Sequence, residues 1–441
     1  MTGIRARSTA LLLLAALLFA LTASSGGAAS QPRARLLGMV PHAGRLAGTP
    51  RLLAKEGPLP LTFDANYQTL IDRYFTDVAH DSGGTDNVYS AATQYYDNPG
   101  AVHIQYQSAF GGSYVDTNPL PAGRCDDGVD PYCLTDRQIQ HEIQRVLTAQ
   151  GWHGGLDHMF FLMTPSGIGT CDSGRSRVCS RGTELGFCAY HSFFADSNHE
   201  DVIYADEPYE GPYIGCAGRD QGVPNDRDAD VTINTISHEH NEAITDPLGD
   251  AWYSSDSNLG ENGDLCAFGY GAQIGIGVGA YNQVINGDHY DLQQEYSNAD
   301  GGCVQHLGGA STPPPLGDGS GPLSYHPNGR VMHTNTTYAI YWLPTIHVPA
   351  VKTAPHVSGR ARVGKKLSGS HGSWTYTARY RYQWLRCNAH GASCSTIPHA
   401  THSTYRLTKR DAGHRLRLRV TATNTAGRAV ATSGASSPIR S

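Results

Sequence analysis

The sequence predicts an exported chain with an α+β region around a metal-binding helix, followed by an all-β sandwich. Three observations predict this fold class. The 441 residues begin with a basic and then an apolar stretch. Helical and strand patterns alternate from residue 59 to 307, and a histidine and two glutamates at helical spacing lie within them. After a Pro- and Gly-rich stretch, apolar residues alternate at strand spacing to the end of the chain.

The first 58 residues are not expected to belong to the fold. Arg5 and Arg7 precede an apolar run, Ala10–Ala23, and small residues follow, so residues 1–30 read as a signal peptide for secretion. Residues 31–58 lack periodicity and are interpreted as a propeptide or a flexible N-terminal segment. Because no later apolar run approaches about 18 residues, stable membrane insertion is not expected.

Charge and cysteine content narrow the class of protein further. The formal charge of −6 and a charged fraction of 16% give no basic surface for nucleic acid. Ten cysteines in an exported chain predict five disulfides. Their spacing suggests the pairs Cys125–Cys133, Cys171–Cys179, Cys188–Cys216, Cys266–Cys303 and Cys387–Cys394.

Residues 59–307 are expected to form the α+β region. Apolar residues at helical spacing predict helices over 67–79 and from Asp136 to about Gly151. The continuous apolar run from His158 to Met163 predicts a buried central strand. Further strands are predicted over 101–110, 187–194 and 202–205.

A helix near residue 240 carries the predicted chemistry. His238 and Glu242 are four residues apart, which places both side chains on one helical face. With Glu239 this is the H-E-x-x-H pattern of zinc proteases, with glutamate in place of the second histidine. We therefore predict that His238 and Glu242 ligate Zn²⁺ and that Glu239 is the catalytic general base. A zincin-like metalloprotease domain follows as the expected fold.

The third metal ligand is expected in the acidic stretch after this helix, which Thr245-Asp246-Pro247 ends. Glu261 is the preferred candidate because a loop can bring it back over the site, with Asp264 next. Asp246 lies close in sequence and stays open as a third choice. A dense acidic loop also suits Ca²⁺, which prefers oxygen ligands, so Ca²⁺ is the alternative ion.

Other polar residues receive lesser roles. His191 is expected to be structural, because it follows Cys188 on a strand that reads as buried. The acids after the 202–205 strand are expected to be solvated. Candidates for stabilising an oxyanion, on residue type alone, are Tyr253 and Tyr290.

Beyond residue 307 the sequence divides into three parts. Residues 308–322 form a linker, stiff where it is proline-rich and flexible where it is glycine-rich. Residues 323–345 contain the strand pattern Tyr338–Trp342, which is expected to return to the sheet of the first domain because an isolated strand cannot bury its apolar face. Residues 351–441 alternate as strands at sandwich spacing and predict an immunoglobulin-like β-sandwich.

The stretch from His238 to Pro247, with Ala251-Trp252-Tyr253 and Glu261 to Cys266, resembles the Exordium or phosphate-induced protein family. The resemblance covers residues 60–307. It implies a secreted, zincin-type domain in which His238, Glu242 and an acid at Glu261 or Asp264 share one site, without assigning a reaction. In such relatives the segment that resembles residues 325–342 comes first; here it follows the domain, so it is either a permuted strand or part of a truncated second copy.

Residues 353–436 resemble the Ig-like repeats that are appended to secreted actinobacterial proteins. Val357-Ser358-Gly359, the run Tyr382 to Cys387, and Asp411-Ala412-Gly413 carry this resemblance. It implies a spacer or adhesion module without catalytic residues.

Together these patterns predict a secreted, monomeric, zinc-dependent hydrolase, a peptidase acting on protein or peptide. The alternative, from a different class, is a non-catalytic protein that binds cell-wall polysaccharide or another carbohydrate on a zincin-like scaffold. The abundance of aromatic residues and the appended module motivate that alternative.

Overall fold

A computed structural model describes most of the chain after residue 60. The described residues are 37–41, 61–98, 101–121, 125–172, 178–181, 185–210, 216–218, 220–254, 260–314, 322–345, 348–376, 379–424 and 427–441. The predicted signal peptide lies outside them, as does most of the predicted N-terminal segment. None of the described helices is long and apolar enough to cross a membrane.

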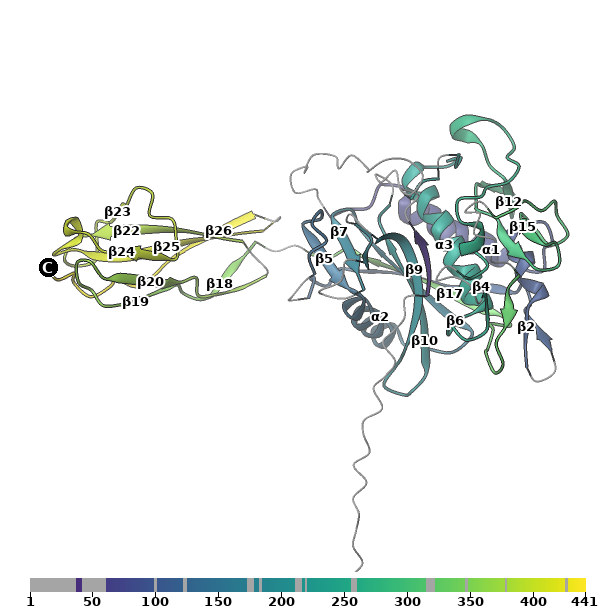
Figure 1. The fold of residues 1–441 in the computed structure, drawn as a ribbon, viewed down its shortest axis with the longest axis horizontal. Coiled ribbons are helices and arrows are strands. Elements are labelled where there is room, and N and C mark those ends of the chain that lie inside the picture. Colours follow the sequence, from purple (N-terminus) through teal and green to yellow (C-terminus); the bar gives the residue numbers. More distant parts are fainter. Residues whose placement is uncertain are drawn as a thin grey trace, which may run out of the picture. The chain divides into compact units, whose positions relative to one another are not determined.

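The first region is built on a mixed nine-stranded sheet (Figure 1). Its pairs are partly parallel, such as β10 with β6, and partly antiparallel, such as β10 with β9. The strands run in the order β4 (Ser108–Asp116), β17 (Asn335–Trp342), β6 (His158–Thr164), β10 (Asp201–Pro208), β9 (Leu185–Ala195), β8 (Val178–Cys179), β7 (Ile168–Cys171) and β5 (Tyr132–Thr135), and β1 (Leu37–Pro41) also pairs with β9.

Helices cover both faces of this sheet. On β6, Phe161 belongs to the core shared with α1 (Tyr67–His80) and α3 (Arg227–Thr245), whereas Phe160 belongs to the core shared with α2 (Asp136–Gln150). Successive strand residues point to opposite faces, so an unbroken apolar strand must be buried on both sides. The fold is therefore a three-layer mixed α/β arrangement.

Helix ends follow local sequence signals. Thr135 and Gln138 form a capping box at the start of α2, and Gly151 ends that helix at a φ of 68°. The side chain of Asp226 accepts hydrogen bonds from two backbone N–H groups in the first turn of α3. That helix ends at Thr245, two residues before Pro247.

The late strand β17 lies inside the sheet of the first region. It pairs in parallel with β4 on one side and with β6 on the other. Ile340 and Trp342 enter the α2 core, while Ala339 and Tyr341 enter the core with α1 and α3. The preceding strand of this sheet along the chain is β10, which ends at Pro208, so the chain returns from a distant part of the sequence to complete the sheet.

One sequence expectation was wrong in detail. The strand predicted over 101–110 is instead a short strand, β3 (Val102–His103), followed by a loop and then β4. Ile104 and Tyr106 are buried, but on the loop, and Val102 is 46% exposed. Apolar alternation here reflects a loop that packs onto the core, because periodicity alone does not distinguish the two.

Short elements complete the first region between the main helices and strands. They are η2 (Val88–Gln94), β2 (Tyr96–Asp97), β11 (Trp252–Tyr253), η3 (Asp264–Cys266), η4 (Gly277–Gly279), β12 (Gln283–Ile285), β13 (Asp288–Tyr290), β14 (Glu295–Ser297), β15 (Gly302–Val304) and β16 (Ser324–Tyr325).

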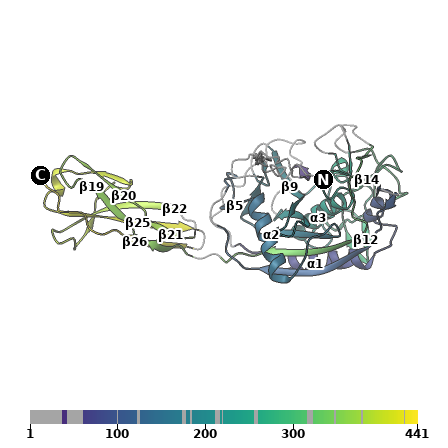
Figure 2. The same ribbon diagram turned by 90° about the horizontal axis from the view of Figure 1, so that it is seen from below.

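The described residues from 350 onward are all-β apart from one short 3-10 helix (Figure 2). Their core surrounds Trp384, with Leu416 and Leu418 beside it. The elements are β18 (Ala350–Thr353), β19 (His356–Gly359), β20 (Lys366–Ser370), β21 (Ser373–Thr375), β22 (Arg379–Cys387), β23 (Ser395–Thr396), β24 (Thr404–Arg406), η5 (Lys409–Asp411), β25 (Arg415–Asn424) and β26 (Gly427–Thr432).

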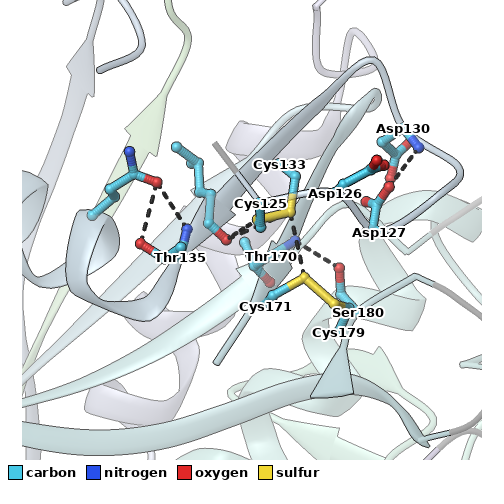
Figure 3. Close-up of a disulfide and its surroundings, with 12 residues drawn as sticks. Cys125, Asp126, Asp127, Asp130, Cys133, Thr135, Thr170, Cys171, Cys179 and Ser180 are labelled. Atoms are coloured by element: carbon cyan, nitrogen blue, oxygen red, sulfur yellow. Dashed lines mark hydrogen bonds between the residues drawn. A yellow bond between two sulfur atoms is a disulfide. The ribbon is translucent and has the colours of Figure 1, made fainter. Parts of the chain in front are cut away.

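All ten cysteines form the five disulfides expected from their spacing. Cys125–Cys133 and Cys171–Cys179 lie next to one another, with 3.4 Å between the sulfurs of Cys133 and Cys171 (Figure 3). Since these sulfurs are already bonded in pairs, they are not thiolate ligands for a metal. Disulfides at this density are typical of extracellular proteins.

Candidate metal centre

Helix α3 brings the predicted residues to the middle of the first region. It packs against both β9 and β10, and every residue from Ala229 to Thr245 is buried. Nε2 of His238 lies 3.0 Å from Oε1 of Glu242, which is the pairing expected from their spacing of four. Glu239 lies beside them and is also fully buried.

Strand β9 adds His191 to this group. Its Nδ1 lies 3.2 Å from Oε2 of Glu239 and 3.6 Å from Oε2 of Glu242, and its Nε2 lies 3.7 Å from Oε1 of Glu261. The expectation that His191 is only structural is therefore wrong: it stands between three carboxylates of the candidate site. The two histidines approach Glu242 from different elements, one at each carboxylate oxygen.

The loop before η3 supplies the remaining acids. Glu261 faces His191, and Oδ1 of Asp264 lies 3.8 Å from Nε2 of His238. The backbone N–H of Asp264 donates to Oε1 of Glu242 over 2.7 Å, which holds the loop against the helix. A Cβ added at Gly263 would lie 2.9 Å from Oε1 of Glu242, so glycine is needed for this close approach.

Asp246, the third candidate ligand, serves a different purpose. One of its oxygens accepts hydrogen bonds from the backbone N–H groups of Asp250 and Ala251 over 2.7 and 2.6 Å. It also forms a side-chain hydrogen bond with Glu261. Asp246 therefore shapes the turn after α3 and positions Glu261, while Glu261 and Asp264 are nearer to the histidines.

Gln293 orients one of the histidines. Its amide Nε2 lies 2.5 Å from Nδ1 of His238 and donates to the carbonyl oxygen of Gly263 over 3.1 Å. With Nδ1 engaged in this way, Nε2 is the ring nitrogen that faces Glu242. An amide nitrogen is a donor, so Nδ1 accepts in this arrangement and the ring proton lies on Nε2. Metal binding at Nε2 requires the reverse, with Nδ1–H donating to an oxygen. Rotation of the Gln293 amide by 180° supplies that oxygen, Oε1, which has no hydrogen-bond partner among the described residues.

Several atoms in this cluster lack hydrogen-bond partners among the described residues. They are Nε2 of His191, Nε2 of His238, Oε1 of Glu239, Oε2 of Glu242 and Oε1 of Glu261. Within the described part of the chain, the ion-pair partners of these three glutamates are histidines and not lysine or arginine. Buried carboxylates without a cationic partner are costly, so the arrangement is incomplete as a purely structural network.

Burial and mutual repulsion govern the pKa values of these acids. Burial raises the pKa of Glu239 well above its usual range, and the neighbouring charge of Glu242 raises it further. Burial also raises the pKa of Glu261, again with repulsion from Glu242. Burial alone would raise the pKa of Glu242 too, but His238 and His191 outweigh it and lower that pKa to about 2. Glu242 is thus the acid held ionised, whereas Glu239 and Glu261 have a raised affinity for a proton.

The donor set suits Zn²⁺ better than Ca²⁺. Ligand atoms of His191, Glu242 and Glu261 lie within 4.8 Å of one another, and so do those of His238, Glu239 and Glu242. Each group contains one imidazole, and Glu242 is the residue common to both; no group found among the described residues joins His238 to Glu261. Imidazole ligands are typical of zinc sites, whereas Ca²⁺ takes oxygen ligands. The unpartnered nitrogen and oxygen atoms point to a cation that accepts both kinds of donor.

Other residues considered from the sequence lie outside this cluster. Tyr290 donates to Asp77 over 2.5 Å and accepts from Arg73, and Tyr253 stacks on His326 with 3.6 Å between ring centroids, so neither faces the site. The acids at the end of β10, expected to be solvated, are fully buried: Asp206, Glu207 and Glu210.

Sequence reasoning missed His191 and Gln293. A histidine within the otherwise apolar and aromatic run of β9 was the available signal for the first. Gln293 offered no signal, because its role depends on a fold-back of more than 50 residues. Searches against family models, curated proteins and solved structures found no match to this chain. The resemblances drawn from the sequence therefore remain proposals.

Proposed function

We propose that this protein is a secreted, zinc-dependent hydrolase that acts on protein or peptide substrates, built on a zincin-like domain. One observation carries the proposal: two histidines and three glutamates from three separate segments form two buried groups that share Glu242, and several of their ligand atoms lack hydrogen-bond partners among the described residues. A divalent cation would neutralise this charge and satisfy these atoms together.

The residues have distinct roles in this proposal. His238, Glu242 and Glu261 hold the ion, and His191 is a fourth donor within reach. When bound, Zn²⁺ supplies Lewis-acid polarisation of a carbonyl and acidifies a water molecule. Glu239 takes the proton of that water at Oε1, the oxygen that has no hydrogen-bond partner among the described residues, while Oε2 stays paired with His191.

Metal content tests the ion-binding half of the proposal. Protein purified without added metal should carry about one zinc per chain, and His238→Gln or Glu242→Gln should reduce this to less than about a tenth. His240→Gln is the matched control, because His240 is a buried histidine of the same helix that bonds Tyr89 and Asn335 instead. Equal zinc content in all four proteins would refute the proposed centre.

Turnover tests the catalytic half. Glu239→Gln should retain zinc and lose at least about 100-fold in the rate of casein or peptide hydrolysis, since it removes the general base. If wild type shows no turnover, and both proteins bind cell-wall polysaccharide equally, the non-catalytic binding alternative replaces the hydrolase.

The C-terminal all-β region has a separate proposed role. We infer an immunoglobulin-like spacer or adhesion module, in keeping with the sequence resemblance. Two short β-sheets and one of four strands enclose its tryptophan-centred core. Asp411, which is fully buried there, has both carboxylate oxygens engaged in a structural network.

A further inference from the structure

A segment of the N-terminal region lies as a strand beside the candidate metal centre. β1 pairs antiparallel with β9, with Leu37 opposite His191 and Met39 opposite Tyr190. In Figure 1 it is the dark-purple strand between β9 and α3. Its partner positions on β9 thus include the histidine that faces Glu239, Glu242 and Glu261.

The same strand also lies near the other two elements that form the site. Its backbone comes within 8 Å, between Cα atoms, of α3, which carries His238 and Glu242, and of η3, which begins at Asp264. The clustered side chains are correspondingly closed off: Glu261 is the most exposed of the five at 6%, and the other four are at 0%. A hydrolytic site needs access for substrate, so something must uncover it.

We propose that residues 37–41 are an autoinhibitory strand that occupies the peptide-binding edge of β9 and keeps the metal centre closed. An extended peptide substrate then takes the same place once this strand is displaced or removed. That the displacing peptide is a substrate rests on the proposed function. That residues 37–41 occupy the edge of β9 rests on strand pairing alone.

The chemistry of the edge supports an extended polypeptide as the occupant. β9 hydrogen-bonds to β10 on one side, and on the other it offers backbone N–H and C=O groups over residues 187–191. Such an edge binds any extended chain through main-chain hydrogen bonds, with little demand on side chains. A polysaccharide cannot reproduce this ladder.

A proline substitution in the full secreted chain tests the inference. Met39→Pro removes a backbone N–H and restricts φ, which disfavours the strand, whereas Met39→Ala changes only the side chain. Met39→Pro should raise amide exchange over residues 187–191 at least ~10-fold and should speed zinc loss to a chelator to a similar degree. It should also bind a labelled peptide with the sequence of residues 35–44, which wild type and Met39→Ala should not.

The outcomes separate this inference from the proposed function. Equal amide protection of β9 in all three proteins, or no peptide binding by Met39→Pro, would overturn the inference even if wild type hydrolyses peptides. Peptide binding by Met39→Pro, together with absence of zinc and of turnover, would support the occupied edge and refute the hydrolase. Binding with turnover that rises only in Met39→Pro supports both.

Discussion

Two buried acidic sites in this chain are built in opposite ways. In the C-terminal β region, Asp411 is fully buried and accepts hydrogen bonds from Arg386, from Tyr405 and from the backbone and side chain of Thr408. In the first region, Glu239, Glu242 and Glu261 are also buried, yet each has an oxygen without a hydrogen-bond partner among the described residues.

The pKa values of these acids differ correspondingly. Burial alone would raise the pKa of Asp411, but hydrogen bonds from Thr408 and Arg386 outweigh it and hold that pKa below its ordinary value. For Glu239 and Glu261 the same burial is uncompensated, so their pKa values rise. A satisfied acid specifies a fold, whereas an unsatisfied group of acids with nearby imidazoles indicates a ligand that completes it.

The largest expected effect comes from removing β17, which should be essential to the first region although it lies close in sequence to the C-terminal region. A chain ending at Pro349 keeps β17 between β4 and β6, whereas one ending at Leu307 loses that central strand. We expect the shorter chain to fail to fold, because two sheet interfaces and the buried Ile340 and Trp342 are lost together. Thermal melts of the two chains decide it. Equal melting temperatures would show that β17 is dispensable to the first region.

Substitution of one charge in each site gives the next largest effect. Arg386→Ala leaves the Asp411 carboxylate buried without its cation and should destabilise the C-terminal region by about 3 kcal/mol. Glu239→Gln in metal-free protein removes a carboxylate whose ion-pair partner is His191, not lysine or arginine, and keeps an oxygen that can accept from His191, so it should not destabilise the first region. Urea unfolding of each variant against wild type measures both. Comparable losses of stability in the two would mean that Glu239 is a structural acid like Asp411.

Much of the fold could be predicted because local patterns there agree with burial. The apolar run of β6 and the capping signals of α2 mark their elements from neighbouring residues alone. The loop over 104–107 could not be predicted, because Ile104 and Tyr106 alternate like a strand although they only pack onto the core. Placement of β17 needed a physical argument, since its apolar face had no nearby partner in sequence.

The site was predictable only in its helical part. Helical spacing joins His238 to Glu242, and the loop acids after Pro247 were within short reach of them. His191 comes from a strand almost 50 residues earlier, and only the pairing of β9 within the sheet brings it beside α3. Long-range geometry of this kind leaves no periodic trace, so residue type was the only clue.

A smaller effect is expected from the outer contact to His238. Gln293→Ala removes the amide that engages Nδ1 of His238, without removing any metal donor. Zinc affinity should fall ~10–100-fold, as is typical for loss of a partner behind a metal-bound histidine. Gln294→Ala is a neighbouring control, because Gln294 bonds Cys303 and Thr312 instead. Competition with a zinc chelator measures both. Equal affinities for the two variants would remove Gln293 from the site.

The smallest expected effect is an opposite response to pH in the two regions. Asp411 has a folded-state pKa below its ordinary value of 3.8, so its contribution is fully present above that pH and is lost as pH falls below it. Asp206 in the first region behaves inversely: burial, with the nearby charge of Asp136, raises its pKa to about 8.

The sign for Asp206 follows from proton uptake. Between the ordinary and the folded pKa the native state binds the extra proton, so stability falls as pH rises, by about 1.4 kcal/mol per pH unit at most. Asp206→Asn mimics the protonated side chain and should remove this slope. The stability difference between the variant and wild type, from urea unfolding at pH 5 to 8, should therefore grow with pH. A constant difference over that range would mean that Asp206 is ionised in the folded protein, and that its burial is compensated as that of Asp411 is.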